Sequence, residues 1–156
     1  MAVWSDKDFG MAEVWSTIGV FALGGVGWVA TSFIGSPFRQ FYDLRSEAIQ
    51  KSVLYANVRA SAKQDRPDYK SLVELDEADL DRLRKAQEEY RDLAARMRAF
   101  ALNERFAVRL VKWCGYDPLK ASSALLGVSN TIDTYGLDRA AAAKTLEQVL
   151  RFRTVE

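Results

Sequence analysis

The chain has 156 residues, enough for one domain or for a small domain with an appendage. Hydrophobic residues make up 49% and charged residues 28%, which are ordinary values for a globular protein and exclude disorder throughout the chain. The 22 lysines and arginines against 21 acidic residues leave a net charge of +1. This balance excludes a strongly basic nucleic-acid binder, so we expect no nucleic-acid partner.

The sequence has no histidine and only one cysteine, Cys114. Catalysis by Ser-His-Asp or Cys-His groups, histidine metal sites, disulfides within the chain and cysteine-rich zinc sites are therefore excluded. Motifs for phosphate-binding loops, HExxH zinc sites and calcium loops are absent as well. We predict no catalytic residue, no metal and no cofactor, and we interpret Cys114 as a buried structural thiol.

A stretch without any charged residue separates Glu13 from Arg39. Its apolar core, Val14–Ile34, has 21 residues, which at about 1.5 Å per residue span the roughly 30 Å hydrocarbon thickness of a bilayer. A helix buried in a soluble core is the alternative, but such helices are usually shorter and amphipathic. We predict a transmembrane helix over residues 14–36, preceded by a flank over residues 1–13 whose acidic residues argue against a cleaved signal peptide.

Basic residues are distributed unevenly about this stretch, because Lys7 is alone on the N-terminal side while Arg39, Arg45 and Lys51 follow on the C-terminal side. The positive-inside rule then places the N-terminus outside a bacterial inner membrane and makes residues 37–156 a cytoplasmic domain. The lipid bilayer is thus a predicted partner. We expect Arg39, Arg45 and Lys51 to contact its head groups.

Small residues recur at intervals of four within the apolar stretch, at Gly27, Thr31 and Gly35. This spacing places them on one face of a helix, where they permit close approach of a second helix. Trp28 also falls inside the stretch, where an indole N–H prefers a protein partner to lipid. These four residues predict helix packing and a homo-oligomer, although glycine is frequent in membrane helices in any case.

Residues 37–156 show helical periodicity. A helix over about 38–62 either starts anew, with Ser36 as its cap and Pro37 in its first turn, or continues the membrane helix with a kink. Residues 63–73 are polar and charged, and we interpret them as a surface connection.

A long helix is predicted to begin after the cap Asp76 and to continue to Trp113, before Gly115 ends it. Its apolar seam follows a heptad-like spacing and consists of Leu80, Leu83, Gln87, Tyr90, Ala94, Met97 and Ala101. Its basic residues alternate with acids, so we expect local ion pairs rather than contacts with lipid or RNA. They are Arg91, Arg96, Arg98, Arg105, Arg109 and Lys112.

Two shorter helices follow. Asp117 and Pro118 fit the cap and first position of a helix that extends to about Tyr135, and a last helix covers about Asp138–Phe152. No segment alternates as a strand does and no hairpin turn is evident, so we expect no sheet. The predicted fold class is all-α, with one N-terminal transmembrane helix and a cytoplasmic helical bundle of four or five helices.

Polar residues interrupt two of the apolar helices, at Asn57 and at Ser129 with Asn130. Asparagine is mildly unfavourable within a helix and is usually there for a hydrogen bond. We interpret these three as buried polar groups that fix the register of the bundle. A ligand site is the alternative.

The segments SFIGSPFRQFYDLRSEAIQKSVLYANV and LLGVSNTIDTYG resemble a group of small bacterial proteins with one N-terminal membrane helix. The layout is also similar to that of the membrane accessory proteins of RNA-targeting type VI-B CRISPR systems. That similarity implies a membrane helix before a helical cytoplasmic domain, and assembly into a ring-shaped pore. The R-x4-6-H signature of HEPN ribonucleases cannot be completed here, because there is no histidine.

Three functional hypotheses follow. The first is a membrane-anchored, self-associating helical protein that acts as an oligomeric scaffold or pore, since one helix alone cannot line a channel. The second is a monomeric anchored adaptor that binds a cytoplasmic protein partner on its charged helices. The third is an enzyme that uses carboxylate or lysine chemistry, which requires a concave pocket with convergent charged residues.

Overall fold

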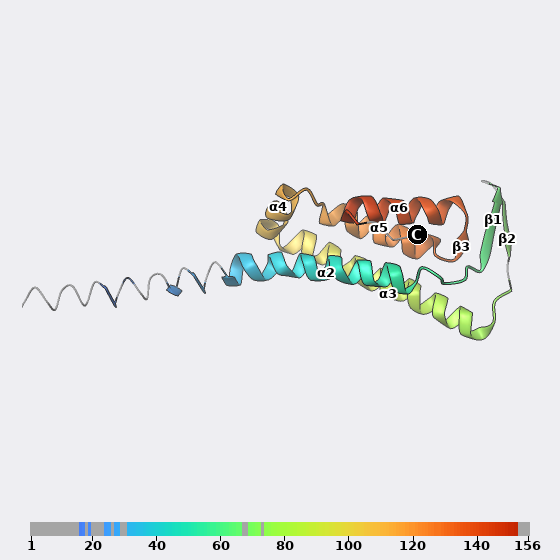
Figure 1. Ribbon diagram of the computed structural model, residues 1–156, viewed down its shortest axis with the longest axis horizontal. Helices are drawn as coiled ribbons and strands as arrows, with labels where there is room; N and C mark the ends of the chain where they lie inside the picture. The colour runs from blue at the N-terminus through green and yellow to red at the C-terminus, as the bar shows by residue number, and fades with distance from the viewer. Residues whose placement is uncertain are drawn as a thin grey trace, which may run out of the picture. The chain divides into compact units, whose positions relative to one another are not determined.

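The computed structural model describes residues 16–17, 19, 24–25, 27–28, 31–66, 69–72 and 74–152 (Figure 1). The chain divides into two compact units, Met1–Pro37 and Phe38–Glu156, each of which is considered by itself. The predicted flank over residues 1–13 lies outside the described residues, and so do residues 14–15, 18, 20–23, 26 and 29–30 of the predicted transmembrane helix. None of the helices built from described residues combines the length and the apolar character that crossing a membrane requires.

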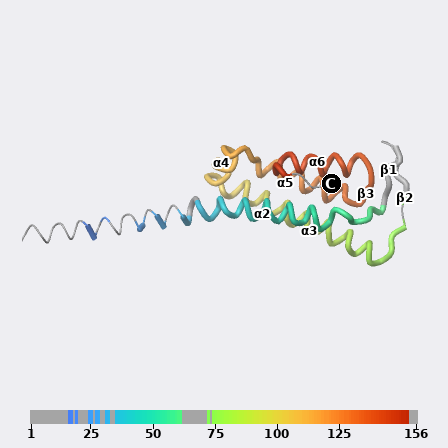
Figure 2. Tube along the Cα trace, in the orientation of Figure 1, coloured from blue at the N-terminus to red at the C-terminus, as the bar shows by residue number. Residues whose placement is uncertain are grey.

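The second unit is a bundle of α-helices, which confirms the predicted helical bundle. The helices are α2 (Ser36–Leu54), α3 (Glu77–Asn103), α4 (Arg105–Trp113), α5 (Pro118–Thr131) and α6 (Leu137–Leu150). Figure 1 shows α2 and α3 running alongside one another, with α5 and α6 packed on the same side of them. The tube in Figure 2 shows α4 at one end of the bundle, and Figure 1 shows the short strands at the other end.

The start of α2 differs from a simple capped helix. Thr31–Gly35 form one turn of π-helix, and α2 begins at the very next residue. The predicted cap at Ser36 is therefore wrong, and the alternative of a helix that continues past Pro37 holds over these residues. Proline lacks the N–H that would bond to the carbonyl four residues earlier, and the wider π turn lies where that carbonyl is.

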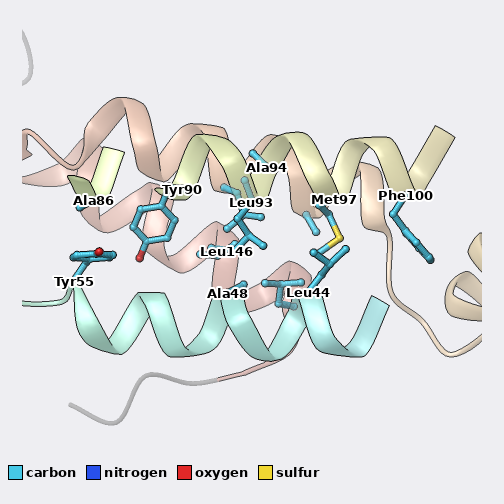
Figure 3. Close-up of a cluster of buried hydrophobic side chains, with 14 of the residues drawn as sticks. Leu44, Ala48, Tyr55, Ala86, Tyr90, Leu93, Ala94, Met97, Phe100 and Leu146 are labelled. Atoms are coloured by element: carbon cyan, nitrogen blue, oxygen red, sulfur yellow. The ribbon is translucent and has the colours of Figure 1, made fainter. Parts of the chain in front are cut away.

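One core cluster joins buried residues of α2, α3, α4, α5 and α6. Phe41, Leu44 and Ala48 of α2 are buried against a long apolar stripe of α3. The buried residues of that stripe are Leu83, Ala86, Tyr90, Leu93, Ala94, Met97 and Phe100. Figure 3 shows Leu93 and Met97 pointing from α3 toward Ala48 and Leu44. The predicted seam is confirmed at its buried members, since four of its residues belong to this stripe.

Helix α5 packs on α3 through small and polar residues. Ser122 donates a hydrogen bond to the carbonyl of Ala94 at 2.9 Å, and Ser129 donates one to the carbonyl of Gln87 at 3.0 Å. Both serines are buried. Their hydroxyls therefore find partners on the neighbouring helix, so burial leaves no unmet polar group there.

Two predicted caps are confirmed. Asp76 accepts a hydrogen bond from the backbone N–H of Asp79 at 2.7 Å, and Asp117 accepts from those of Leu119 and Lys120. A carboxylate at this position satisfies backbone donors that the first helical turn leaves without partners.

The long helix predicted to reach Trp113 is interrupted at Glu104, whose ψ of 59° leaves the helical region. Helix α4 starts at the next residue and buries Ala107 and Val111. It ends as expected before Gly115, which has a φ of 85°. Tyr116 N–H bonds to the carbonyl of Val111 and Gly115 N–H to that of Lys112, the pattern of a Schellman motif.

A small sheet contradicts the expectation that the chain has none. β1 (Ala62–Arg66) pairs antiparallel with β2 (Tyr69–Leu72), and β1 also pairs in parallel with β3 (Thr134–Tyr135). The surface connection predicted over 63–73 thus contains a hairpin. Its strands are polar and lack apolar alternation, so the pairing comes from backbone hydrogen bonds that leave no sequence periodicity.

We predict that Leu93→Ala lowers the free energy of unfolding by about 2–5 kcal/mol, because Leu93 is fully buried between helices and its truncation leaves a cavity. Leu102→Ala is the matched control on the same helix, since Leu102 is exposed. Chemical unfolding of the full-length protein in mild detergent measures both. Equal losses in the two variants would contradict this description of the core.

Candidate functional site

The predicted packing face, defined as Gly27, Thr31 and Gly35, is exposed in the described residues. The Thr31 hydroxyl donates a hydrogen bond to the carbonyl of Gly27 at 2.8 Å. A Cβ atom added at Gly27 would meet no other atom within 4 Å, and the Trp28 side chain is 67% exposed. The face is therefore smooth, its hydroxyl is satisfied, and nothing in the described chain covers it.

Arg45, predicted to contact lipid head groups, is held inside the domain instead. Its Nε donates to the carbonyl of Leu150 at 2.8 Å, and its Nη2 donates to that of Arg151 at 3.1 Å. Its guanidinium also lies 5.5 Å from the ring centroid of Tyr116. A cation at the C-terminal end of a helix satisfies free carbonyls and the helix dipole, so Arg45 ties α6 to α2.

Lys51 is likewise engaged within the domain rather than free for lipid. Its Nζ lies 2.9 Å from Glu89 Oε2 on α3 and 3.3 Å from Glu47 Oε1. Glu47 also pairs with Arg96 of α3 at 2.8 Å. These groups form a chain of ion pairs across the α2–α3 contact. Only Arg39, of the three predicted head-group contacts, is simply exposed.

The charges of this network shift the pKa values of its members. Burial, and then a hydrogen bond with Glu89, raise the pKa of Tyr55 to about 12. The hydrogen bond with Lys51 holds the pKa of Glu89 below its usual value, although burial acts in the opposite direction. Burial alone would lower the pKa of Lys51, but hydrogen bonds with Glu89 and Glu47 raise it. At neutral pH Lys51 and Glu89 are therefore charged and Tyr55 is neutral, and the pair of Lys51 with Glu89 links the two helices.

The three predicted buried polar residues separate into two groups. Ser129 is buried and bonded to α3. Asn57 and Asn130 are exposed, which corrects their interpretation as buried groups. In each case an adjacent residue takes the inward position, Val58 beside Asn57 and Ser129 beside Asn130, so each asparagine faces solvent. Cys114, the C-cap residue of α4, is exposed, which corrects its interpretation as a buried structural thiol.

A cavity of about 210 Å³ lies among α2, α3, α5 and α6. Its lining includes Tyr90 and Arg139. Arg139 donates to the carbonyls of Val58 at 2.9 Å, Ala56 at 3.2 Å and Ile132 at 3.3 Å. Because these carbonyls occupy the guanidinium, its role there is to join loop ends rather than to bind an anion.

The structure also shows a surface that the sequence analysis did not single out. Helix α4 exposes Phe106 and Trp113, and its basic residues are Arg105, Arg109 and Lys112. None of these three basic residues is among those that form ion pairs in the described part of the chain. The expected local pairing is thus wrong for them, although it holds for Arg96 with Asp92. The sequence feature that indicates this surface is the segment Arg105–Trp113, which contains three basic and two aromatic residues and no acidic residue.

Comparison of the chain with protein-family models, curated proteins and solved structures gives no match. The resemblance to small single-pass bacterial proteins and the similarity of layout to CRISPR accessory proteins stay predictions. Over the residues that the structure describes, no group of three or more cysteine, aspartate or glutamate side chains is arranged to hold a metal ion.

We predict that Glu89→Gln lowers the free energy of unfolding at neutral pH by about 1–2 kcal/mol, because it removes the carboxylate that Lys51 and Tyr55 share. The folded-state pKa of Glu89 is lower than its unfolded value, so its contribution is present above the unfolded pKa and is lost as pH falls through the folded pKa. The gap between wild type and variant should therefore narrow as the pH falls below about 4.3, the ordinary pKa of an unfolded glutamate.

Thermal unfolding of the full-length protein in detergent, repeated from neutral to acidic pH, measures this gap. Glu88→Gln is the matched control, because Glu88 is the exposed neighbour of Glu89 on the same helix. It should change stability little at any pH. A Glu89→Gln deficit that persists unchanged in acid would show that shape rather than charge explains it.

Proposed function

We propose that the chain is a membrane-anchored, self-associating helical protein that acts as an oligomeric scaffold or pore in a bacterial inner membrane. In this proposal the N-terminus is outside, residues 14–36 span the bilayer and residues 37–156 are cytoplasmic. The observation that carries it is the uncovered face of Gly27, Thr31 and Gly35 beside the exposed Trp28.

The chemistry of this face favours a second helix as its cover. Glycine at two positions lets another backbone approach closely, which provides van der Waals contact that lipid tails do not match. The Thr31 hydroxyl already bonds to the carbonyl of Gly27, so covering it leaves no unmet donor. Trp28 then gains a protein surface for its ring and a partner for its N–H.

The cytoplasmic unit supports the same proposal as a rigid body. Its core is continuous from α2 through α3 to α5 and α6, and ion pairs link α2 to α3. A single helix cannot enclose a channel, so any pore requires several copies arranged about an axis. The bundle would then hold those copies at a fixed spacing.

A groove on the bundle favours the second candidate, a monomeric anchored adaptor. It lies between α5 and α6, has a volume of about 460 Å³, and includes Ala124, Gly127 and Ala142 in its lining. Small residues on two neighbouring helices leave room for an apolar ridge of a cytoplasmic protein partner.

We predict that Gly27→Leu dissociates the assembly, because the leucine side chain prevents close helix approach. The native mass of full-length protein in mild detergent measures this. Gly25→Leu is the matched control: it adds the same side chain two residues away, about 200° around an α-helix, where a Cβ also meets nothing within 4 Å.

A discrete oligomer in wild type and in Gly25→Leu, together with a smaller particle in Gly27→Leu, is the expected result. The same large mass in all three proteins would rule out this packing face. A monomeric wild type would rule out self-association and leave the adaptor, with the groove between α5 and α6 as its docking site.

A further inference from the structure

Helix α4 presents two different faces. Ala107 and Val111 are buried in the core, while Trp113 is 88% exposed and Phe106 is 54% exposed. These two aromatic residues are seven positions apart, so they lie two turns apart on the same side of the helix. Large aromatic side chains left in water on one side of a short helix indicate a surface that is covered in the working protein.

The charges on α4 all have one sign. Its sequence, RFAVRLVKW, contains Arg105, Arg109 and Lys112 and no acidic residue. All three are exposed, and Arg109 lies on the same side as the two aromatic residues, one turn from each. Because these basic groups have no ion-pair partners among the described residues, they are available to an anionic surface.

The fold fixes α4 at a particular end of the bundle. Figures 1 and 2 show it at the end where α2 begins. The rings of Phe41, near the start of α2, and Tyr116, just after α4, have centroids 5.4 Å apart. The basic and aromatic helix therefore lies at the end of the bundle where α2 begins, and Phe38, the last residue of the apolar stretch in sequence, belongs to the start of α2.

We propose that α4 lies on the surface of an anionic bilayer, with Phe106 and Trp113 at the level of the glycerol groups and with Arg105, Arg109 and Lys112 on lipid phosphates. Tryptophan is the residue most typical of membrane interfaces, and basic residues beside it bind anionic lipid. A second copy placed on this face by two-fold symmetry would instead bring six uncompensated cations together. The proposal rests on the membrane anchoring in the proposed function but not on self-association.

Nine residues are too few to bind a membrane firmly alone. An anchor in the same chain changes this, because it keeps α4 at high effective concentration near the lipid. Two membrane contacts, the predicted apolar anchor and the basic helix α4, then fix the orientation of the domain on the bilayer.

The test uses full-length protein in vesicles, with an environment-sensitive NBD label at position 106. The labelled chain is Phe106→Cys in a Cys114→Ser background, so the label has a single attachment site. The matched control is Leu137→Cys in the same background, because Leu137 is an exposed apolar residue that begins α6 directly after β3, and Figure 1 shows β3 at the end of the bundle opposite α4. Vesicles consist of phosphatidylcholine, with or without added phosphatidylglycerol, and optionally carry nitroxide-labelled lipid as a quencher.

We expect the label at 106 to show a blue-shifted, several-fold brighter emission and strong quenching by the nitroxide lipid in vesicles with phosphatidylglycerol. High salt should reverse this, and so should the combined Arg105→Gln, Arg109→Gln and Lys112→Gln variant, because both weaken attraction to phosphates. Trp113→Ala should weaken it too. The label at 137 should keep a water-like emission throughout.

Two results would overturn the proposal. A water-like label at 106 on protein that floats with the vesicles shows that the anchor holds while α4 stays off the lipid. A blue shift that is equal in both vesicle types, insensitive to salt and unquenched shows a contact with another copy. If the chain fails to float with phosphatidylcholine vesicles, the anchoring is wrong. Salt-sensitive binding to phosphatidylglycerol vesicles that the triple variant loses would then still support α4, and its absence would reject it.

Discussion

The fully buried ring of Phe41 packs 5.9 Å from Phe100 and 5.4 Å from Tyr116, measured between ring centroids. One side chain thereby joins the start of α2, the end of α3 and the turn after α4. Arg45 adds a polar layer over the same place, since it stacks on Tyr116 and bonds to the last carbonyls of α6. The C-terminal end of α6 is thus fixed to α2, and the position of α4 depends on this cluster.

The helix boundaries that the sequence predicted correctly depend on local interactions. Asp76 and Asp117 cap helices, and Gly115 ends one, because each interaction involves residues within one turn of chain. The signals that failed depend on distant partners. No glycine or proline near Glu104 predicts the helix break there. The break changes the direction of the chain, and Ala107 and Val111 of α4 then lie in the core. The β1–β3 pairing likewise joins segments far apart in sequence.

The difference between local and distant interactions also explains which parts of the candidate site could be predicted from the sequence. The face of Gly27, Thr31 and Gly35 could be read from spacing alone, because helical geometry fixes which residues share a side. Arg45 and Lys51 were assigned to lipid because they follow an apolar stretch, yet their partners Leu150 and Glu89 come from helices that only the fold brings close. A basic residue near a predicted membrane segment is therefore informative about lipid only when no acidic or carbonyl group of the folded domain reaches it, as on α4.

Ser122 and Ser129 are seven residues apart, and so are their acceptors, Gln87 and Ala94, in the reverse order. The two hydrogen bonds therefore fit only one register of the antiparallel helices α5 and α3. Sliding α5 along α3 by one residue, about 1.5 Å, pulls both hydroxyls off their carbonyls at once. The two hydrogen bonds therefore resist sliding of α5 along α3 in addition to the packing of the small side chains. Two buried hydroxyl groups therefore contribute to the resistance of the domain to shear along the α3–α5 contact.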